Sequence, residues 1–368
     1  MRGKIKKVFP GGNTSQGFYS FYHHILSHNA NRIFLFKGGP GTGKSAFMNK
    51  IADSVSELNY DVEYHCCSSD NTSIDAIVIP DLKVAFMDGT APHSVDPQYP
   101  GLVEEIIDLG AFLDEVGLQG KKKEIIQARE EVKRLFRLAY AYLQQSKILK
   151  GEIESYYTDS KSLDIPGLNE TTLSLNKLIF GDKFLKTTSK ERHLFASAIT
   201  PQGAVNHLDT IFSGLDRRII IEGSAGTGKA AIVKNIYQNA VIRGFDVEIY
   251  HCGLIPQEIE HIVIKELSTG IITSEPPHIF NGDTEDKVIK THNFVDFSLL
   301  NPFMDDLEKA KTRYEEAFGR GVTFINRAKR AHDILENYYK PNMDFEKLDD
   351  YFEEILEKIL FYSEKKHT

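Results

Sequence analysis

Two glycine-rich segments, 185 residues apart, have residue types and spacing that could bind phosphate. Residues 38–45 read GGPGTGKS, and residues 223–230 read GSAGTGKA. Glycines in such a segment let successive backbone N–H groups turn inward toward phosphate oxygens, and the lysine adds a full positive charge. A helix that begins at the segment adds partial positive charge at its N-terminus. The candidate phosphate-binding residues are Gly38, Gly39, Gly41, Thr42, Gly43, Lys44, Ser45, Gly223, Gly226, Thr227, Gly228 and Lys229.

The first segment also has residues that could hold a divalent cation. Ser45 follows the lysine, at the position whose hydroxyl ligates Mg²⁺. Asp88 ends the apolar run 84–87, and a carboxylate at the end of a neighbouring strand is the second expected metal group. Lys44 and Asp88 are therefore the candidate catalytic residues, and Ser45 and Asp88 are the candidate Mg²⁺ ligands. Because Gly89 follows Asp88, no adjacent glutamate is present to activate water.

The second segment lacks both metal groups. Ala230 takes the place of Ser45, and Thr273 lies at the position that corresponds to Asp88. The lysine, Lys229, is retained together with the loop glycines. Two interpretations remain open: the second segment binds phosphate without catalysis, or it is a relic that folds well but binds nothing.

Other polar residues near these segments are weaker candidates. His93 could sense a γ-phosphate or move a proton, but its counterpart His278 lies in a half without metal groups, which favours a structural role. Asp70 could orient a water molecule, although capping a turn is the favoured interpretation. Cys66 and Cys252 each follow a histidine. Because adjacent side chains point to opposite faces of a strand, we expect buried cysteines rather than metal ligands.

The chain is a tandem duplication. Many matches besides the glycine-rich segments recur in the same order at nearly the same offset, which chance does not explain. We predict two domains, residues 1–185 with the intact segment and residues 186–368 with the degenerate one, joined near residues 181–192. The clearest matches are TSQG at 14–17 with TPQG at 200–203, DVE at 61–63 with DVE at 246–248, and ESYY at 154–157 with ENYY at 336–339.

Each half begins with the same expected elements. Buried strands are predicted over the apolar runs 32–36 and 218–222, and helices over 45–58 and 230–244, each after a glycine-rich segment. Further strands are expected at 61–67 and 246–252, which indicates a parallel α/β sheet. Residues 73–82 fit either a helix or a strand. Residues 83–90 fit a buried strand that ends at Asp88.

A long helix is expected toward the end of each half. Apolar residues recur every three or four positions over 122–157 and over 307–339, although Gly319 and Gly321 weaken the second helix. The favoured interpretation is that these apolar stripes pack on each other or on the sheet. A lid, or a surface for a protein partner, is the alternative.

Composition narrows the class of protein. Of the 368 residues, 41% are hydrophobic and 26% are charged, and the net charge of −8 argues against nucleic acid as a partner. The longest apolar runs are too short to span a membrane, and the basic N-terminus is not followed by the apolar core of a signal peptide. An odd count of three cysteines fits a reducing compartment, so we expect a cytoplasmic protein. The sequence leaves the oligomeric state open.

Through GGPGTGKS and VAFMDGT the chain resembles the P-loop (Walker A) NTPase superfamily. Over its whole length it looks like a bacterial family of tandem-duplicated P-loop proteins of the ATPase or nucleotide-kinase-like type. The resemblance implies two tandem three-layer α/β/α domains with parallel sheets, and ATP or GTP with Mg²⁺ as ligands. It does not imply a substrate. The departures at Ala230 and Thr273 put a second catalytic site in doubt.

These observations lead to one expected function and two alternatives. We expect Mg²⁺-dependent nucleotide binding and hydrolysis, the activity of an ATPase, in the first half, with the second half a regulatory or structural copy. The first alternative is a small-molecule or nucleotide kinase in which the long helices form a lid. The second is an interaction protein that binds nucleotide without hydrolysing it.

Overall fold

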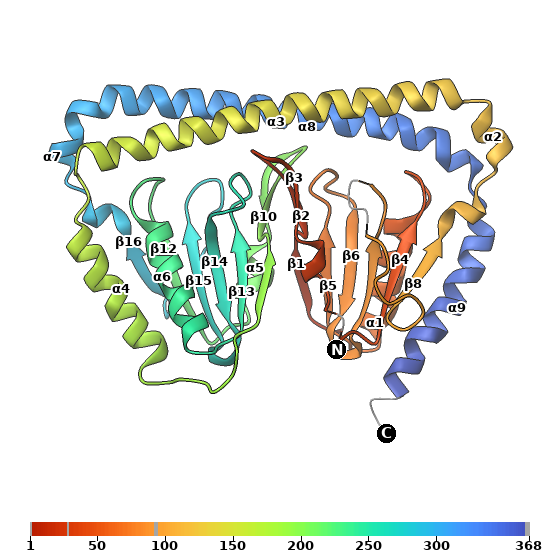
Figure 1. Cartoon of the computed structure of the whole chain (residues 1–368), viewed down its shortest axis with the longest axis horizontal. Helices are drawn as coiled ribbons and strands as arrows, with labels where there is room; N and C mark the ends of the chain where they lie inside the picture. Colours follow the sequence, from red (N-terminus) through yellow and green to blue (C-terminus); the bar gives the residue numbers. More distant parts are fainter. Residues whose placement is uncertain (1, 28, 92–94, 365–368) are drawn as a thin grey trace. The chain divides into compact units, whose positions relative to one another are not determined.

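The computed structural model describes residues 2–27, 29–91 and 95–364 (Figure 1). The chain forms two compact units. Unit 1 consists of the residues up to 11, residues 20–138 and the residues from 324 onward, and unit 2 consists of residues 12–19 and 139–323. Each unit is built around one six-stranded sheet.

The sheet of unit 1 has the strand order β1-β5-β6-β7-β4-β8. Strand β6 runs antiparallel to both of its neighbours, and the other pairs of adjacent strands are parallel. The strands are β1 Ile5–Val8, β4 Arg32–Lys37, β5 Val62–Cys66, β6 Ile74–Ile79, β7 Val84–Asp88 and β8 Glu104–Asp108.

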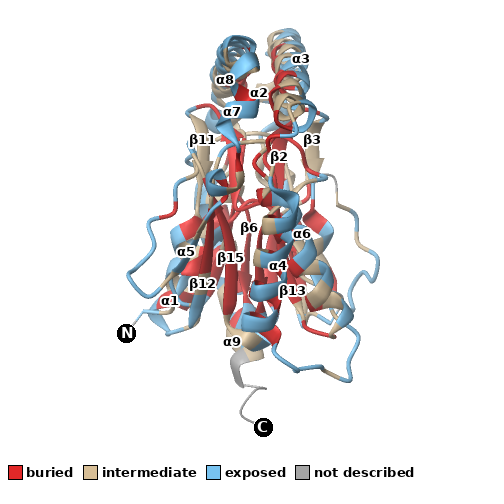
Figure 2. Ribbon diagram, turned by 90° about the vertical axis from the view of Figure 1, so that its left-hand side faces the viewer, coloured by how far each residue is buried: buried red, intermediate tan, exposed pale blue. Residues whose placement is uncertain are grey.

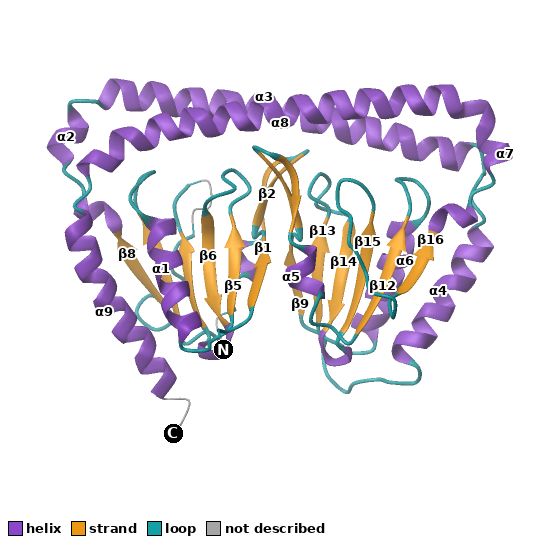
Figure 3. Ribbon diagram, turned by 180° about the vertical axis from the view of Figure 1, so that it is seen from behind, coloured by secondary structure: helices purple, strands orange, loops and turns teal. Residues whose placement is uncertain are grey.

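The sheet of unit 2 repeats this arrangement, with the order β9-β13-β14-β15-β12-β16 and an antiparallel β14 (Figure 3). Phe36 pairs with Asp88 in unit 1, and Ile221 pairs with Thr273 in unit 2, so Asp88 and Thr273 occupy equivalent positions. The strands are β9 Glu191–Leu194, β12 Arg217–Glu222, β13 Val247–His251, β14 Ile259–Ile264, β15 Thr269–Ser274 and β16 Lys287–Lys290.

The expectation of purely parallel sheets is therefore wrong, because both sheets are mixed. Residues 73–82, which fitted either a helix or a strand, form β6 and then the short 3-10 helix η2 Pro80–Leu82. Only residues 67–73 connect β5 to β6, whereas a parallel crossover needs about a dozen residues or more. The length of the connection thus dictates the antiparallel direction.

Two helices cover one face of each sheet. In unit 1, α1 Lys44–Glu57 and α9 Phe345–Glu364 pack together on this face, where the rings of Phe47 and Phe352 lie 5.4 Å apart. In unit 2, α6 Lys229–Ile242 and α4 Ile165–Phe180 take the same places.

The opposite face of the unit 2 sheet carries the short helix α5 Leu208–Phe212 (Figure 2). The ring of Phe212 packs there on Tyr250 and His261. The 3-10 helix η1 Tyr22–His24 holds the corresponding place in the sequence of unit 1. In unit 2 a short helix thus forms a thin third layer.

The repeats exchange their C-terminal helices. Helix α4 belongs to the first repeat in sequence, yet its apolar side packs on the sheet of the second repeat. Helix α9 follows the second repeat and packs on the sheet of the first. The compact units therefore do not coincide with residues 1–185 and 186–368, since each unit combines the sheet of one repeat with the last helix of the other.

Two hairpins accompany the sheets: β2 Gly11–Thr14 with β3 Gly17–Ser20, and β10 Ser197–Thr200 with β11 Gly203–Asn206. Residues 12–19 of the first hairpin belong to unit 2, where the Ser15 hydroxyl donates a hydrogen bond to the Leu254 carbonyl at 2.7 Å. A second segment of the first repeat is thereby part of the unit built on the second repeat.

Both long helices are continuous, as the sequence predicts: α3 Lys122–Asp159 and α8 Met304–Tyr339. In unit 2 their apolar stripes pack on each other through Ile153 and Leu307. A Cβ atom at Gly321 would lie 2.8 Å from the Leu143 side chain, so this glycine permits close packing rather than breaking the helix. No helix among the described residues is long and apolar enough to cross a membrane.

The remaining helices are short connections. They are α2 Glu115–Gln119, α7 Phe297–Leu300, η3 Leu109–Phe112, η4 Lys265–Leu267, η5 Thr291–Phe294, η6 Asn301–Phe303 and η7 Lys340–Asn342.

Candidate functional site

The first glycine loop, residues 38–45, connects β4 to α1 at the carboxyl end of the strand. Gly41 and Gly43 have φ angles of 71° and 90°, in the left-handed region that glycine adopts at no steric cost. Gly43 is the residue that caps the N-terminus of α1. The glycines therefore allow the chain to turn directly from a buried strand into a helix whose N-terminus faces the loop.

Lys44 and Asp88 are brought together at this loop. The Lys44 ammonium donates hydrogen bonds to the carbonyls of Gly38 and Gly39, at 3.0 and 2.9 Å, and lies 3.6 Å from Asp88 Oδ2. Their side chains are only 11% and 17% exposed, so the attraction between the charges is weakly screened. The structure thus places the two candidate catalytic residues side by side, Lys44 at the start of α1 and Asp88 at the end of β7.

Hydrogen bonds hold the two candidate Mg²⁺ ligands in place. Ser45 Oγ accepts a hydrogen bond from the Ile74 N–H at 3.0 Å. Asp88 Oδ1 accepts from the N–H and the hydroxyl of Thr90, at 2.9 and 2.5 Å, which leaves Oδ2 toward Lys44. One hydroxyl and one carboxylate oxygen suit Mg²⁺, which takes its other ligands from phosphate and water. The described residues contain no cluster of three or more His, Cys, Asp or Glu side chains that could hold a metal ion.

The second glycine loop, residues 223–230, has the same backbone form. Gly226 and Gly228 have φ angles of 86° and 96°, and Gly228 caps α6. Lys229 donates to the Gly223 carbonyl, as Lys44 does to Gly38.

Lys229 also pairs with a carboxylate that the sequence analysis missed. Glu275 Oε2 lies 2.9 Å from the Lys229 ammonium, although Thr273 supplies no charge at the position of Asp88. The offset of 185 residues places Glu275 opposite Thr90. A comparison of the repeats beyond Thr273 would have shown this acidic residue in the second half. A carboxylate just after the end of β15 therefore lies beside the lysine of the second loop.

A tyrosine from the end of a long helix packs against each loop. A Cβ atom at Gly39 would lie 2.6 Å from the ring of Tyr339, and one at Gly226 would lie 2.6 Å from the ring of Tyr157. Both tyrosines end the repeated motifs ESYY and ENYY, which the sequence analysis used only to align the halves. The last turn of α8 thus contacts the first loop, and the last turns of α3 contact the second.

We predict that Gly39→Ala destabilises unit 1, because the methyl group would overlap the Tyr339 ring. Overpacking of this kind costs about 1–3 kcal/mol of the free energy of unfolding. The cost should fall when Tyr339→Ala is added, and thermal denaturation of the double-mutant cycle measures this coupling. Ser224→Ala, at the equivalent position of the second loop, is the matched control and should be neutral. An equal effect of Gly39→Ala in both backgrounds would show that the contact is unimportant.

The other polar candidates from the sequence are the aspartate, cysteines and histidines near the two loops. Asp70 Oδ1 accepts from the Thr72 N–H at 2.9 Å, which confirms that Asp70 caps a turn. Cys66 and Cys252 are free cysteines, and burial raises the pKa of Cys66 to about 12, so its thiol stays protonated. His93 lies outside the described residues. Its counterpart His278 lines a small pocket in unit 2, and burial lowers the pKa of His278 to about 4.

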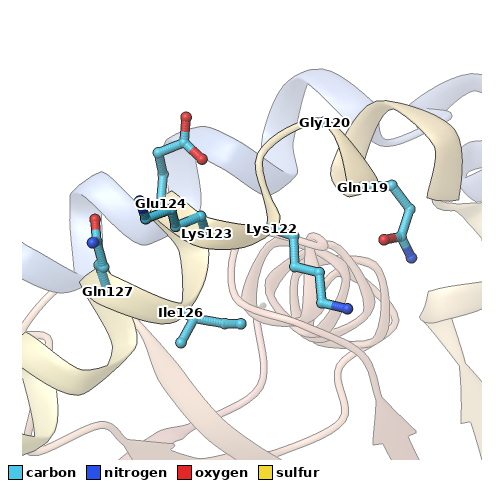
Figure 4. A pocket seen from close by; sticks show the side chains of 7 residues that line it. All are labelled: Gln119, Gly120, Lys122, Lys123, Glu124, Ile126 and Gln127. Carbon is cyan, nitrogen blue, oxygen red and sulfur yellow. The ribbon is translucent and has the colours of Figure 1, made fainter.

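A larger surface pocket lies at the junction of α2 and α3 and has a volume of about 460 Å³. Figure 4 shows that its side chains, among them Gln119, Lys122 and Ile126, come from a single short stretch of chain. All residues that line this pocket lie between 119 and 127, so neither glycine loop contributes to it.

Comparison with known proteins does not add a family to these observations. No protein-family model, no curated protein and no solved structure matches the chain. The interpretation of the site therefore rests on the geometry of the two loops.

Proposed function

We propose that unit 1 binds ATP or GTP together with Mg²⁺ at the first glycine loop and hydrolyses it. The observation that supports this proposal best is the pair formed by Lys44 and Asp88, 3.6 Å apart at the N-terminus of α1. A buried cation and a carboxylate beside a glycine loop are two of the groups that P-loop enzymes use in phosphoryl transfer. The resemblance of the sequence to P-loop NTPases supports the same activity.

Each residue has a defined role in this proposal. The loop N–H groups and the N-terminus of α1 bind the phosphate oxygens. Lys44 leaves the carbonyls of Gly38 and Gly39 and stabilises charge on the β- and γ-phosphates. Ser45 and Asp88 would hold Mg²⁺. When bound, the ion would neutralise charge on the transferring phosphoryl group.

The experiment that tests this function is incubation of the purified protein with labelled ATP or GTP and Mg²⁺, with and without a pool of candidate acceptors. Release of free phosphate without an acceptor is the expected result. Turnover that requires an acceptor would instead identify a kinase, and tight binding without turnover would identify a nucleotide-dependent interaction protein. Failure to bind either nucleotide would overturn the proposal.

We further propose that the second loop binds a phosphate-bearing ligand without Mg²⁺ and does not hydrolyse it. The Lys229 ammonium lies 2.9 Å from Glu275 Oε2. A bound phosphate would displace this carboxylate and pair with the lysine instead. The backbone N–H groups at the start of α6 attract an anion without a metal.

In a Lys44→Ala background, where only the second loop can respond, nucleotide with excess EDTA should raise the melting temperature. Saturation at about 100 times the dissociation constant stabilises by roughly 2.7 kcal/mol, a shift of about 5–10 °C for a unit of this size. Lys229→Ala should abolish the shift, and Glu275→Gln should enlarge it by removing the competing carboxylate. Absence of any shift at millimolar nucleotide, with or without Mg²⁺, would identify the loop as a relic.

A further inference from the structure

A small pocket of about 90 Å³ with several polar side chains in its lining lies within unit 2, beside the carboxyl end of β15. Its polar lining includes Lys150, Glu260, His261, Glu275 and His278. Neither the loop residues nor Lys229 line it, and it is connected to the second loop only through Glu275. It therefore calls for an explanation separate from phosphate binding.

His261 places an unused hydrogen-bond donor at this pocket. The residue is only 1% exposed, and its Nδ1 accepts a hydrogen bond from the Thr273 N–H at 3.1 Å. Burial lowers the pKa of His261 to about 3, so the ring is neutral and its single proton must lie on Nε2. Among the described residues, Nε2 has no hydrogen-bond partner.

Two further buried atoms at the pocket also lack partners. Glu260 Oε2 lies 3.7 Å from His261 Nε2, too far for a hydrogen bond, and has no other hydrogen-bond partner among the residues described. The same is true of His278 Nδ1 within that part of the chain. Buried polar groups in native proteins are nearly always satisfied by protein, water or a ligand. Three unsatisfied atoms around one cavity therefore indicate a polar occupant.

The chemistry of these atoms selects the kind of occupant. A metal ion is excluded at His261, because Nε2 carries the proton and has no lone pair to donate. An anion is disfavoured by the Glu275 carboxylate, and the Lys150 ammonium already pairs with Glu258 at 2.6 Å. A hydroxyl group both accepts and donates, so one oxygen can accept from His261 Nε2–H and donate to Glu260 Oε2.

We propose that this pocket binds a small neutral polyol, one hydroxyl of which bridges His261 Nε2 and Glu260 Oε2. The volume of about 90 Å³ admits several polar heavy atoms, which suits a compact ligand. A second hydroxyl of the same ligand satisfies His278 Nδ1. Binding at this site requires neither nucleotide nor Mg²⁺.

The test uses the full chain without nucleotide and glycerol as the probe, followed by saturation-transfer NMR and titration. We expect saturable binding in the millimolar range. His261→Ala, which introduces the residue found at the equivalent position 76, should weaken it at least tenfold, and the isosteric Glu260→Gln should weaken it without disturbing the fold. His292→Ala, at an exposed histidine away from the pocket, is the matched control and should bind as the wild type does.

Circular dichroism and thermal denaturation of each variant establish that it is folded. If glycerol does not saturate the wild-type protein, or if both His261→Ala and Glu260→Gln bind it as well as the His292→Ala control, the proposal is overturned and the pocket holds ordered water alone. Because no nucleotide is present, this outcome does not depend on the activity proposed for unit 1.

Discussion

Lys44→Ala is expected to lower the rate of nucleotide hydrolysis by about 100-fold or more, the effect of removing one charge-stabilising group from a preorganised site. The Lys44 side chain is 11% exposed and lies 3.6 Å from Asp88 Oδ2, so water cannot readily replace its charge. Nucleotide binding should weaken as well, because in the proposed function the ammonium would contact the β- and γ-phosphates in the ground state. Initial rates of phosphate release at saturating Mg²⁺ measure the effect.

The second loop provides the control for this variant. Lys229→Ala removes the equivalent lysine from unit 2 and should leave turnover unchanged, since Ala230 and Thr273 supply no metal groups there. Full turnover in Lys44→Ala would place the active site elsewhere. A large loss of turnover in Lys229→Ala would instead show that the second loop takes part in catalysis.

Cleavage of the chain in the exposed connection at residues 182–184 should leave its two fragments associated. Each fragment supplies the helix that covers the other fragment's sheet. Separation would remove α9 from unit 1 and expose the side chains of Leu348, Phe352, Ile355 and Ile359, all of which are buried. At about 1.5–3 kcal/mol for each side chain, this loss amounts to roughly 6–12 kcal/mol, comparable to the whole stability of a domain.

Introduction of a specific protease site in this connection, followed by gel filtration, makes the measurement. The cleaved protein should elute as the intact chain does, and the fragments should separate only in denaturant. A chain that stops at Met343, and so lacks α9, is the control and should aggregate or unfold when the full chain does not. Clean separation into two stable, monomeric fragments would refute the helix exchange.

Much of the fold could be predicted from the sequence because its signals are local. The apolar runs of β4 and β12 lead directly into glycines and then into helices with apolar spacing, so strand, loop and helix follow one another without ambiguity. The direction of β6 was also accessible in principle, since it follows from the short connection 67–73. The apolar pattern of residues 73–82 could not show it, because pattern alone says nothing about strand direction.

The exchange of helices could not be predicted. Helices α4 and α9 present similar apolar faces, and Leu168 lies against Gly228 as Leu348 lies against Gly43. The apolar pattern of either helix is therefore compatible with either sheet. The choice between them depends on long-range packing. The contact of Tyr339 with Gly39 was hidden for the same reason, because residues about 300 positions apart meet only in the folded unit.

The position of α9 has a consequence for the synthesis of the protein. The last strand of the unit 1 sheet, β8, ends at Asp108, whereas the helix that covers this sheet ends at Glu364. At about 5–20 residues per second, a ribosome needs roughly 10–50 s to translate the intervening chain. Throughout that time α1 alone covers this face of the nascent sheet, and Phe47 lacks the Phe352 ring that packs on it in the complete unit. The first companion of the nascent chain in the cell should therefore be a chaperone that binds apolar surfaces.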